Sequence, residues 1–195
     1  MLAKLTAMVV TAEQLAAGLT HVRAAPAEQG VVDLVVRRPG LGRREILDAG
    51  ELDTVVGLIG DTWSVRPSRH TPDRSPHPEM QLNLMNARMT ALVAGSEPAD
   101  WALAGDQLYV DLDLSEANLP PGTRLAIGPA AVIEVTAPPH TGCAKFRARF
   151  GPEAMRFVNT AEGRALRLRG MNARVVMGGR VCPGDAIGKV VDGEW

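Results

Sequence analysis

Residues 107–114 read Gln107-Leu108-Tyr109-Val110-Asp111-Leu112-Asp113-Leu114, and this stretch sets the expectation for the whole fold. Every second residue is aliphatic, and the residues between them are mostly polar. Because successive side chains of a strand point to opposite faces, this alternation predicts a half-buried β-strand. Strands with one buried and one solvated face are typical of antiparallel sheets.

The flanking sequence predicts further short strands, separated by turns. Aliphatic runs indicate strands at residues 31–36, 45–47, 81–84, 124–127, 131–136, 173–177, 180–182 and 186–190. Pro39-Gly40-Leu41-Gly42 predicts a turn that connects the strand at residues 31–36 to the strand at residues 45–47. Gly178-Gly179 predicts a hairpin over residues 173–182.

A few short helices complete the predicted elements. Helical spacing indicates helices at residues 11–22, 86–93, 143–150 and 152–158. Thr11 with Gln14 fits a capping box, and Asn86 is a candidate N-cap. The order of elements shows no strand–helix–strand rhythm of the kind that parallel sheets require. We therefore expect a mainly β fold with short helices, a closed β-barrel or a sandwich with helical insertions.

The composition is that of an ordinary globular chain. Hydrophobic residues make up 46% and charged residues 22% of its 195 residues, a balance typical of folded proteins. The formal net charge is −1. Because nucleic-acid-binding proteins usually carry a basic excess, we expect no nucleic-acid partner.

Cys143 and Cys182 are the two cysteines. A single disulfide would be unusual in a chain of this length without a secretory signal, and the apolar run at residues 1–10 is short for such a signal. No stretch approaches the ~20 apolar residues that cross a bilayer. We therefore expect free thiols, a cytoplasmic location and no membrane contact, with Cys182 as a packing residue.

Cys143 is the strongest candidate for a reactive group. It follows Pro138-Pro139-His140-Thr141-Gly142 at the exit of the predicted strand 131–136, where a helix is expected to begin. A helix N-terminus and neighbouring cations such as Lys145 favour the thiolate, which is the nucleophilic and metal-binding form. A buried apolar cysteine is the alternative. The cationic surroundings favour the reactive role.

Other polar residues are weaker candidates for ligand binding. The segment 167–174 places three arginines and Asn172 before a strand, and guanidinium groups bind phosphate or carboxylate through paired hydrogen bonds. A solvated run of charges is the alternative, and it is the more common outcome of such a pattern. Asp61 could bind a ligand or close an Asx-turn, and the long loop 66–78 could carry function or be a surface insertion. The four histidines show no zinc spacing.

Several segments resemble, in order, the motifs of the MOSC domain, the C-terminal domain of molybdenum-cofactor sulfurases. They run from about Glu51 to Val190 and comprise Gly57-Leu58-Ile59-Gly60-Asp61, Ala104-Gly105-Asp106-Gln107-Leu108, Leu125-Ala126-Ile127-Gly128, Gly142-Cys143-Ala144-Lys145-Phe146, and the closing block Arg169–Val176 with Gly178-Gly179 and Pro183-Gly184-Asp185. Two positions depart from the family pattern. Gly142 replaces the usual proline before the cysteine, and Gln107 stands where asparagine is common.

The resemblance implies a MOSC-type closed β-barrel over residues 51–190, with residues 1–50 as a helix and β-hairpin extension that packs on it. It also implies a molybdenum cofactor, molybdopterin, held by Cys143 and by polar motif residues. The candidates for cofactor binding are Asp61, Asn83, Asn86, Asp106, His140, Lys145, Arg169, Gly170, Asn172 and Arg174. Of these, Arg169, Arg174 and Lys145 are expected at the pterin phosphate, and Asp61, Asn83 and Asn172 at the pterin or the substrate.

Three functions remain open at this point. In the first, Cys143 binds molybdenum in an enzyme that reduces N-hydroxylated compounds with the help of an electron-transfer partner. In the second, Cys143 is a sulfur carrier that receives a persulfide from a separate cysteine desulfurase. In the third, the barrel has lost the cofactor and Cys143 is a packing residue.

Overall fold

The computed structural model describes residues 10–190, so the start of the predicted N-terminal extension, residues 1–9, lies outside the described residues, as do residues 191–195. The strands are β1 (Gln29–Arg37), β2 (Glu45–Leu47), β3 (Gly50–Asp53), β4 (Gly57–Leu58), β5 (Leu82–Asn86), β6 (Leu108–Asp111), β7 (Arg124–Ile127), β8 (Ala131–Pro139), β9 (Met171–Met177), β10 (Gly179–Val181) and β11 (Ala186–Lys189). The helices are α1 (Ala12–Arg23), α2 (Ala87–Ala94), α3 (Pro98–Trp101), α4 (Ala144–Asn159) and α5 (Ala161–Ala165), with short 3-10 turns η1 (Trp63–Val65), η2 (Pro78–Met80) and η3 (Ala102–Ala104).

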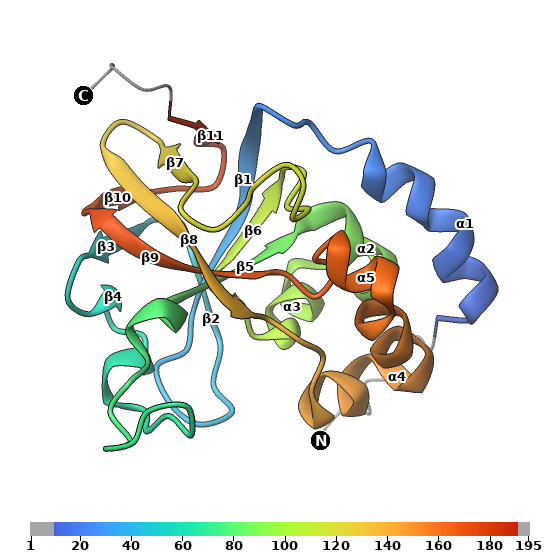
Figure 1. The fold of residues 1–195 in the computed structure, drawn as a ribbon, viewed down its shortest axis with the longest axis horizontal. Coiled ribbons are helices and arrows are strands. Elements are labelled where there is room, and N and C mark those ends of the chain that lie inside the picture. The colour runs from blue at the N-terminus through green and yellow to red at the C-terminus, as the bar shows by residue number, and fades with distance from the viewer. Residues whose placement is uncertain (1–9, 191–195) are drawn as a thin grey trace.

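The strands form a closed barrel, which confirms the predicted fold class. Seven strands follow one another in the order β11-β7-β8-β9-β5-β6-β1, and the pairing of β1 with β11 closes the ring. Closure removes the exposed edges that an open sheet would leave. The helices gather on one side of the barrel (Figure 1), and a small sheet of order β10-β3-β4 lies beside it.

The alternation of apolar residues fills two separate cores. On β6, Leu108 and Val110 belong to the cluster inside the barrel, whereas Tyr109 belongs to the cluster between the barrel wall and the helices. On the helix side, Phe146 and Phe150 of α4 pack in this second cluster. Strands of this barrel are therefore buried on both faces wherever a helix covers them.

This double burial corrects the prediction for residues 107–114. Gln107 and Tyr109 were expected on a solvated face, yet both are fully buried. The hydroxyl of Tyr109 donates to the carbonyl of Trp101 at 2.7 Å, so its polar atom is satisfied inside the second core. The inference was wrong for Tyr109 because a helical layer covers this residue, and for Gln107 because its side chain accepts from the backbone N–H of Asn83 on the neighbouring strand.

Two predictions about strand pairing are also wrong. β5 and β6 pair in parallel, joined through α2, α3 and η3, although the sequence predicted antiparallel strands throughout. The predicted hairpin over residues 173–182 does not form, because β9 pairs with β8 and β5 while β10 pairs with β3. The backbone at Gly178-Gly179 instead carries the chain from the barrel into the small sheet.

Most local signals in the sequence are confirmed. Thr11 caps α1 in a capping box with Gln14, and Asn86 caps α2 by accepting from the backbone N–H of Met89 at 2.9 Å. The hairpin of β1 and β2 forms as predicted. The division of the chain at residue 50 stays a prediction; β1, from the first part, is one of the seven strands of the ring. Within the described residues, no helix is long and apolar enough to cross a membrane.

Candidate functional site

A pocket of about 730 Å³ lies beside the N-terminus of α4. Its walls come from the ends of β1 and β5, the β1–β2 loop, the long loop 66–77, and the first turns of α4. The volume is within the ~300–1,000 Å³ typical of small-molecule sites. The long proline-rich loop is therefore a wall of a pocket, and its residues His70 and His77 belong to the lining.

The lining of this pocket is strongly basic. It contains Lys145 and six arginines, which are Arg38, Arg44, Arg66, Arg69, Arg149 and Arg169. Among the lining residues that the structure describes, none is an aspartate or glutamate. A pocket lined by charges of one sign attracts ligands of the opposite sign, so this pocket favours the binding of an anion.

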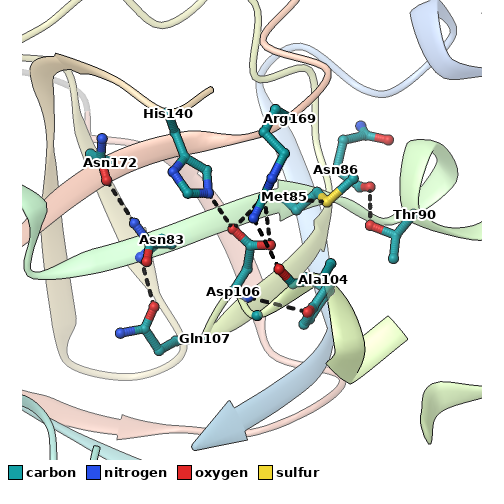
Figure 2. Close-up of polar contacts among 12 residues, drawn as sticks. Asn83, Met85, Asn86, Thr90, Ala104, Asp106, Gln107, His140, Arg169 and Asn172 are labelled. Carbon is teal, nitrogen blue, oxygen red and sulfur yellow. Dashed lines mark hydrogen bonds and ion pairs between the residues drawn. The ribbon is translucent and has the colours of Figure 1, made fainter. Parts of the chain in front are cut away.

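Asp106, His140 and Arg169 form a cluster at the wall of the pocket, in which Asp106 and Arg169 are buried and His140 is half-buried (Figure 2). The Asp106 carboxylate is fully buried and accepts from Nη1 of Arg169 at 2.8 and 3.0 Å and from Nε2 of His140 at 2.9 Å. Burial alone would raise the pKa of Asp106, but the charge of Arg169 and the bond from His140 outweigh it and lower this pKa to about 2. Asp106 is therefore an anion at neutral pH.

The same cluster keeps His140 neutral. Burial and the nearby charge of Arg169 lower the pKa of His140 below its ordinary value, against the opposing effect of Asp106. An ionised carboxylate only accepts hydrogen bonds, so the proton of the neutral ring is on Nε2, where it is donated to Asp106. Nδ1 is then the ring nitrogen with a free lone pair, and His140 is one of the residues that line the pocket.

Arg169 is held by the fold and still has an unused donor. Its side chain is buried, its Nη2 donates to the carbonyl of Ala104 at 2.9 Å, and its guanidinium lies 5.0 Å from the ring centre of Phe146. Nε of Arg169 has no hydrogen-bond partner among the described residues. A buried donor without a partner destabilises the protein. A site that binds an anion at this point would leave such a donor unpaired until the anion is bound.

Glycine is required at position 170, next to this arginine. Its φ of 105° lies in the left-handed region, which side chains other than glycine rarely adopt. A Cβ atom there would lie 2.1 Å from the carbonyl oxygen of Leu84 and 3.3 Å from the ring of His140. Gly170 therefore serves the close packing of β5 against the Arg169 segment.

A second buried ion pair fixes another part of the wall. Asp61 accepts from Nε and Nη2 of Arg38 at 2.8 and 2.9 Å, and Nη1 of Arg38 donates to Oδ1 of Asn83 at 3.0 Å. Burial opposes ionisation of Asp61, but the hydrogen bonds and charge of Arg38 lower its pKa below the ordinary value. Nδ2 of Asn83 donates in turn to Asn172 at 2.6 Å (Figure 2). This network orients Arg38 and Asn83 toward the pocket.

Cys143 is exposed and lines the pocket. It is the N-cap of α4, as the sequence predicted, and its thiol is free. The packing of α4 explains the glycine that precedes it. The N–H of Gly142 donates to Asn159 at 3.1 Å, and a Cβ at position 142 would lie 2.7 Å from Sδ of Met155. Proline would lose this bond and meet these atoms, so glycine fits this position at the start of the helix better than proline.

Two of the predicted cofactor-binding residues lie away from the pocket. Asn86 is used in the cap of α2 and in a bond to the carbonyl of Leu112. Arg174 is exposed, pairs with Glu134, and lines a separate, smaller cavity of about 390 Å³. The oxygens of Asp61 and the amide of Asn172 also bind protein partners, so these two residues support the wall rather than face the pocket.

The sequence missed most of the basic lining. Arg38, Arg44, Arg66 and Arg149 were not candidates, because they come from three segments that are far apart along the chain: residues 38–44, the loop 66–77 and α4. Only the barrel brings them together. Among residues 10–190, no three histidine, cysteine, aspartate or glutamate side chains are grouped as metal ligands. Cys143 carries the one thiol in the described lining of this pocket, and a thiolate is a soft metal ligand.

Comparison with known proteins identifies relatives of this chain. Residues 75–188 match the model of the MOSC domain family. The YUAD protein of Bacillus subtilis has a similar structure, with a TM-score of 0.56 and 17% identity over 82% of this chain and 94% of that one. YiiM of Escherichia coli gives a TM-score of 0.52 and 19% identity over 83% of this chain and 70% of that one. A hypothetical protein of solved structure gives a TM-score of 0.57 and 21% identity over 85% of this chain and 70% of that one. No curated protein matches the sequence.

Proposed function

Because the chain belongs to the MOSC domain family, we propose that it binds a molybdenum cofactor in the basic pocket, with the Cys143 thiolate as a ligand of the metal. The single observation that carries this proposal is the exposed Cys143 thiol in the lining of a pocket whose charged side chains are all basic. Molybdopterin ends in a phosphate, which guanidinium groups bind well, and thiolate is a soft metal ligand. The donors present therefore fit the group.

Individual residues have distinct roles in this proposal. Arg169 and Lys145 would hold the phosphate, since Nε of buried Arg169 lacks a protein partner and Lys145 lines the same pocket. Asn83, which lines the pocket and is fixed by Arg38 and Asn172, would contact the pterin. Arg174 and Asn86 have no role at this site, because they lie elsewhere.

When bound, the cofactor would supply redox chemistry, and we propose the reduction of N-hydroxylated compounds as its use. Cleavage of an N–OH bond releases water and consumes protons as well as electrons. Nδ1 of neutral His140 is a suitable atom to accept and deliver these protons, because Asp106 fixes the tautomer and Arg169 keeps the ring from being permanently charged. The electrons would come from a separate redox partner.

The test is the metal and pterin content of protein purified from a host that makes the cofactor. Wild-type protein is expected to contain molybdenum and pterin, and Cys143→Ser is expected to lose the metal. Cys182→Ser is the matched control, because Cys182 is a free cysteine outside the pocket lining, and it should retain both. Equal molybdenum in Cys143→Ser and wild type would refute ligation by this thiol.

A sulfur carrier is the second candidate, and the exposure of Cys143 favours it. Cys143 is exposed, so a cysteine desulfurase can reach its thiol. A thiol at the bottom of a pocket could not be reached by another protein. After incubation with a desulfurase and cysteine, mass spectrometry would show one added sulfur on Cys143 and none on Cys182. An unmodified Cys143 under these conditions would exclude this role. A chain with neither metal nor persulfide would be a barrel without the cofactor.

A further inference from the structure

Two arginines of the basic pocket form a pair that the proposed cofactor site does not use. Arg44, from the β1–β2 loop, and Arg149, from α4, reach the same place beside Gly105. A Cβ built on Gly105 would lie 3.1 Å from Nη2 of Arg44 and 3.8 Å from Nη1 of Arg149. Gly105, with a φ of 92°, therefore leaves the space that the two guanidinium groups occupy.

The protein fixes both arginines without neutralising them. Nε of Arg44 donates to the carbonyl of Ala102 at 3.2 Å, and Nη1 of Arg149 donates to the carbonyl of Leu103. Both acceptors are uncharged backbone oxygens of η3. Among residues 10–190, neither arginine forms an ion pair, in contrast to Arg38 and Arg169, which are paired with buried carboxylates.

The unpaired charges affect the pKa of Arg44. Burial, followed by the charges of Arg149 and Arg38, lowers the pKa of Arg44 below its ordinary value. Like charges held together in a half-buried place destabilise the free protein unless an anion binds between them. A planar fork with several remaining N–H donors is also the geometry that binds a phosphate.

The number of free cations exceeds what one cofactor phosphate needs. Arg44, Arg66, Arg69, Lys145 and Arg149 all line the pocket without an ion pair among the described residues. A phosphate monoester carries at most about two negative charges at neutral pH. If Lys145 and the free donor of Arg169 hold the cofactor phosphate, a cluster of positive charge remains for a second anion.

We infer that Arg44 and Arg149 form a subsite for a phosphate group carried by the substrate, so that the substrate is a phosphorylated small molecule. This inference rests on the proposed function, because it takes the cofactor phosphate to be bound elsewhere in the pocket. The subsite stays open when the cofactor is present. The phosphate anchors the substrate on η3 and α4, and its reacting end faces the side of the pocket that holds Cys143.

The test is the binding of inorganic phosphate at constant ionic strength, followed by phosphorus NMR. It is made on the cofactor-free and the cofactor-loaded protein. Wild type is expected to bind phosphate in both forms. Arg44→Gln and Arg149→Gln should each weaken this binding by about 10-fold or more, since each removes charge-assisted hydrogen bonds. Arg147→Gln is the matched control, because Arg147 is an exposed arginine of the same helix outside the pocket lining.

The outcomes separate the two sources of phosphate. If loading with cofactor abolishes phosphate binding, and both variants lose pterin, the pair binds the cofactor and the inference is wrong. If the variants keep the pterin content of wild type but lose phosphate binding, the subsite belongs to the substrate. If wild type takes up no cofactor, the proposed function fails, and the effect of the variants on the cofactor-free protein decides the phosphate subsite alone. Equal phosphate binding by wild type, Arg44→Gln, Arg149→Gln and Arg147→Gln would overturn the proposed subsite.

Discussion

Replacement of Asp106 by asparagine tests the cluster at the wall of the pocket. The substitution keeps the shape of the side chain but removes the charge that pairs with Arg169 and accepts from His140. Lowering of the Asp106 pKa from 3.8 to about 2 corresponds to roughly 2–3 kcal/mol of stabilisation at neutral pH. Breaking a buried pair also leaves the partner charge uncompensated, which typically costs about 3–5 kcal/mol. We therefore expect the variant to lose about 3 kcal/mol of unfolding free energy.

The dependence on pH follows from the direction of the pKa change. Because the pKa of Asp106 is lower in the folded chain, the unfolded chain takes up the proton first as the pH falls. The stabilisation is complete above about pH 4 and is lost as the pH falls toward about 2. The difference between wild type and Asp106→Asn should therefore be constant from pH 7 to about 4 and become smaller below.

Urea denaturation at a series of pH values measures this difference directly. Glu134→Gln is the control, because Glu134 forms ion pairs with the exposed Arg124 and Arg174 at the surface, and such pairs contribute less than about 1 kcal/mol. An Asp106→Asn variant as stable as wild type at pH 7, or a difference that grows on acidification, would refute the cluster as described.

Three further predictions concern single residues. Since the pKa of His140 is lowered in the folded state, wild-type stability should fall as the pH drops below about 6.5, and His140→Gln should remove that part of the pH dependence in urea denaturation; an unchanged pH profile would contradict it. Exposed Cys143 should react with iodoacetamide faster than half-buried Cys182, and peptide mass spectrometry would measure the two rates. Faster labelling of Cys182 would contradict the exposure of Cys143. Gly170→Ala should lower the unfolding free energy by more than about 2 kcal/mol, because it adds a Cβ 2.1 Å from the carbonyl oxygen of Leu84 in a left-handed backbone; a neutral effect would show that the strand pair relaxes without cost.

Local features of the fold could be predicted from the sequence, whereas the pairing of distant strands could not. The cap at Asn86 and the capping box at Thr11 depend on residues only a few positions apart, and both are confirmed. The parallel pairing of β5 with β6 and the separation of β9 from β10 depend on the closure of the whole ring. A glycine turn such as Gly178-Gly179 permits a hairpin but does not require one.

The same distinction applies to the candidate site. Cys143 stood out because its cap position and its neighbouring cations are local, and the structure places it in the pocket. The arginine pair at Arg44 and Arg149 could not be predicted, because its members come from opposite parts of the chain and meet only on η3. Arg174 was a candidate because it is near Arg169 in sequence, yet it lies further along β9, opposite Glu134 of β8, with which it forms an ion pair.

Anomalous diffraction at the molybdenum absorption edge, on crystals of protein purified from a host that makes the cofactor, would locate the metal relative to Cys143. We expect one molybdenum peak in the basic pocket, within bonding distance of Sγ of Cys143. A metal site elsewhere, or full cofactor occupancy with Cys143 pointing away from the metal, would contradict it.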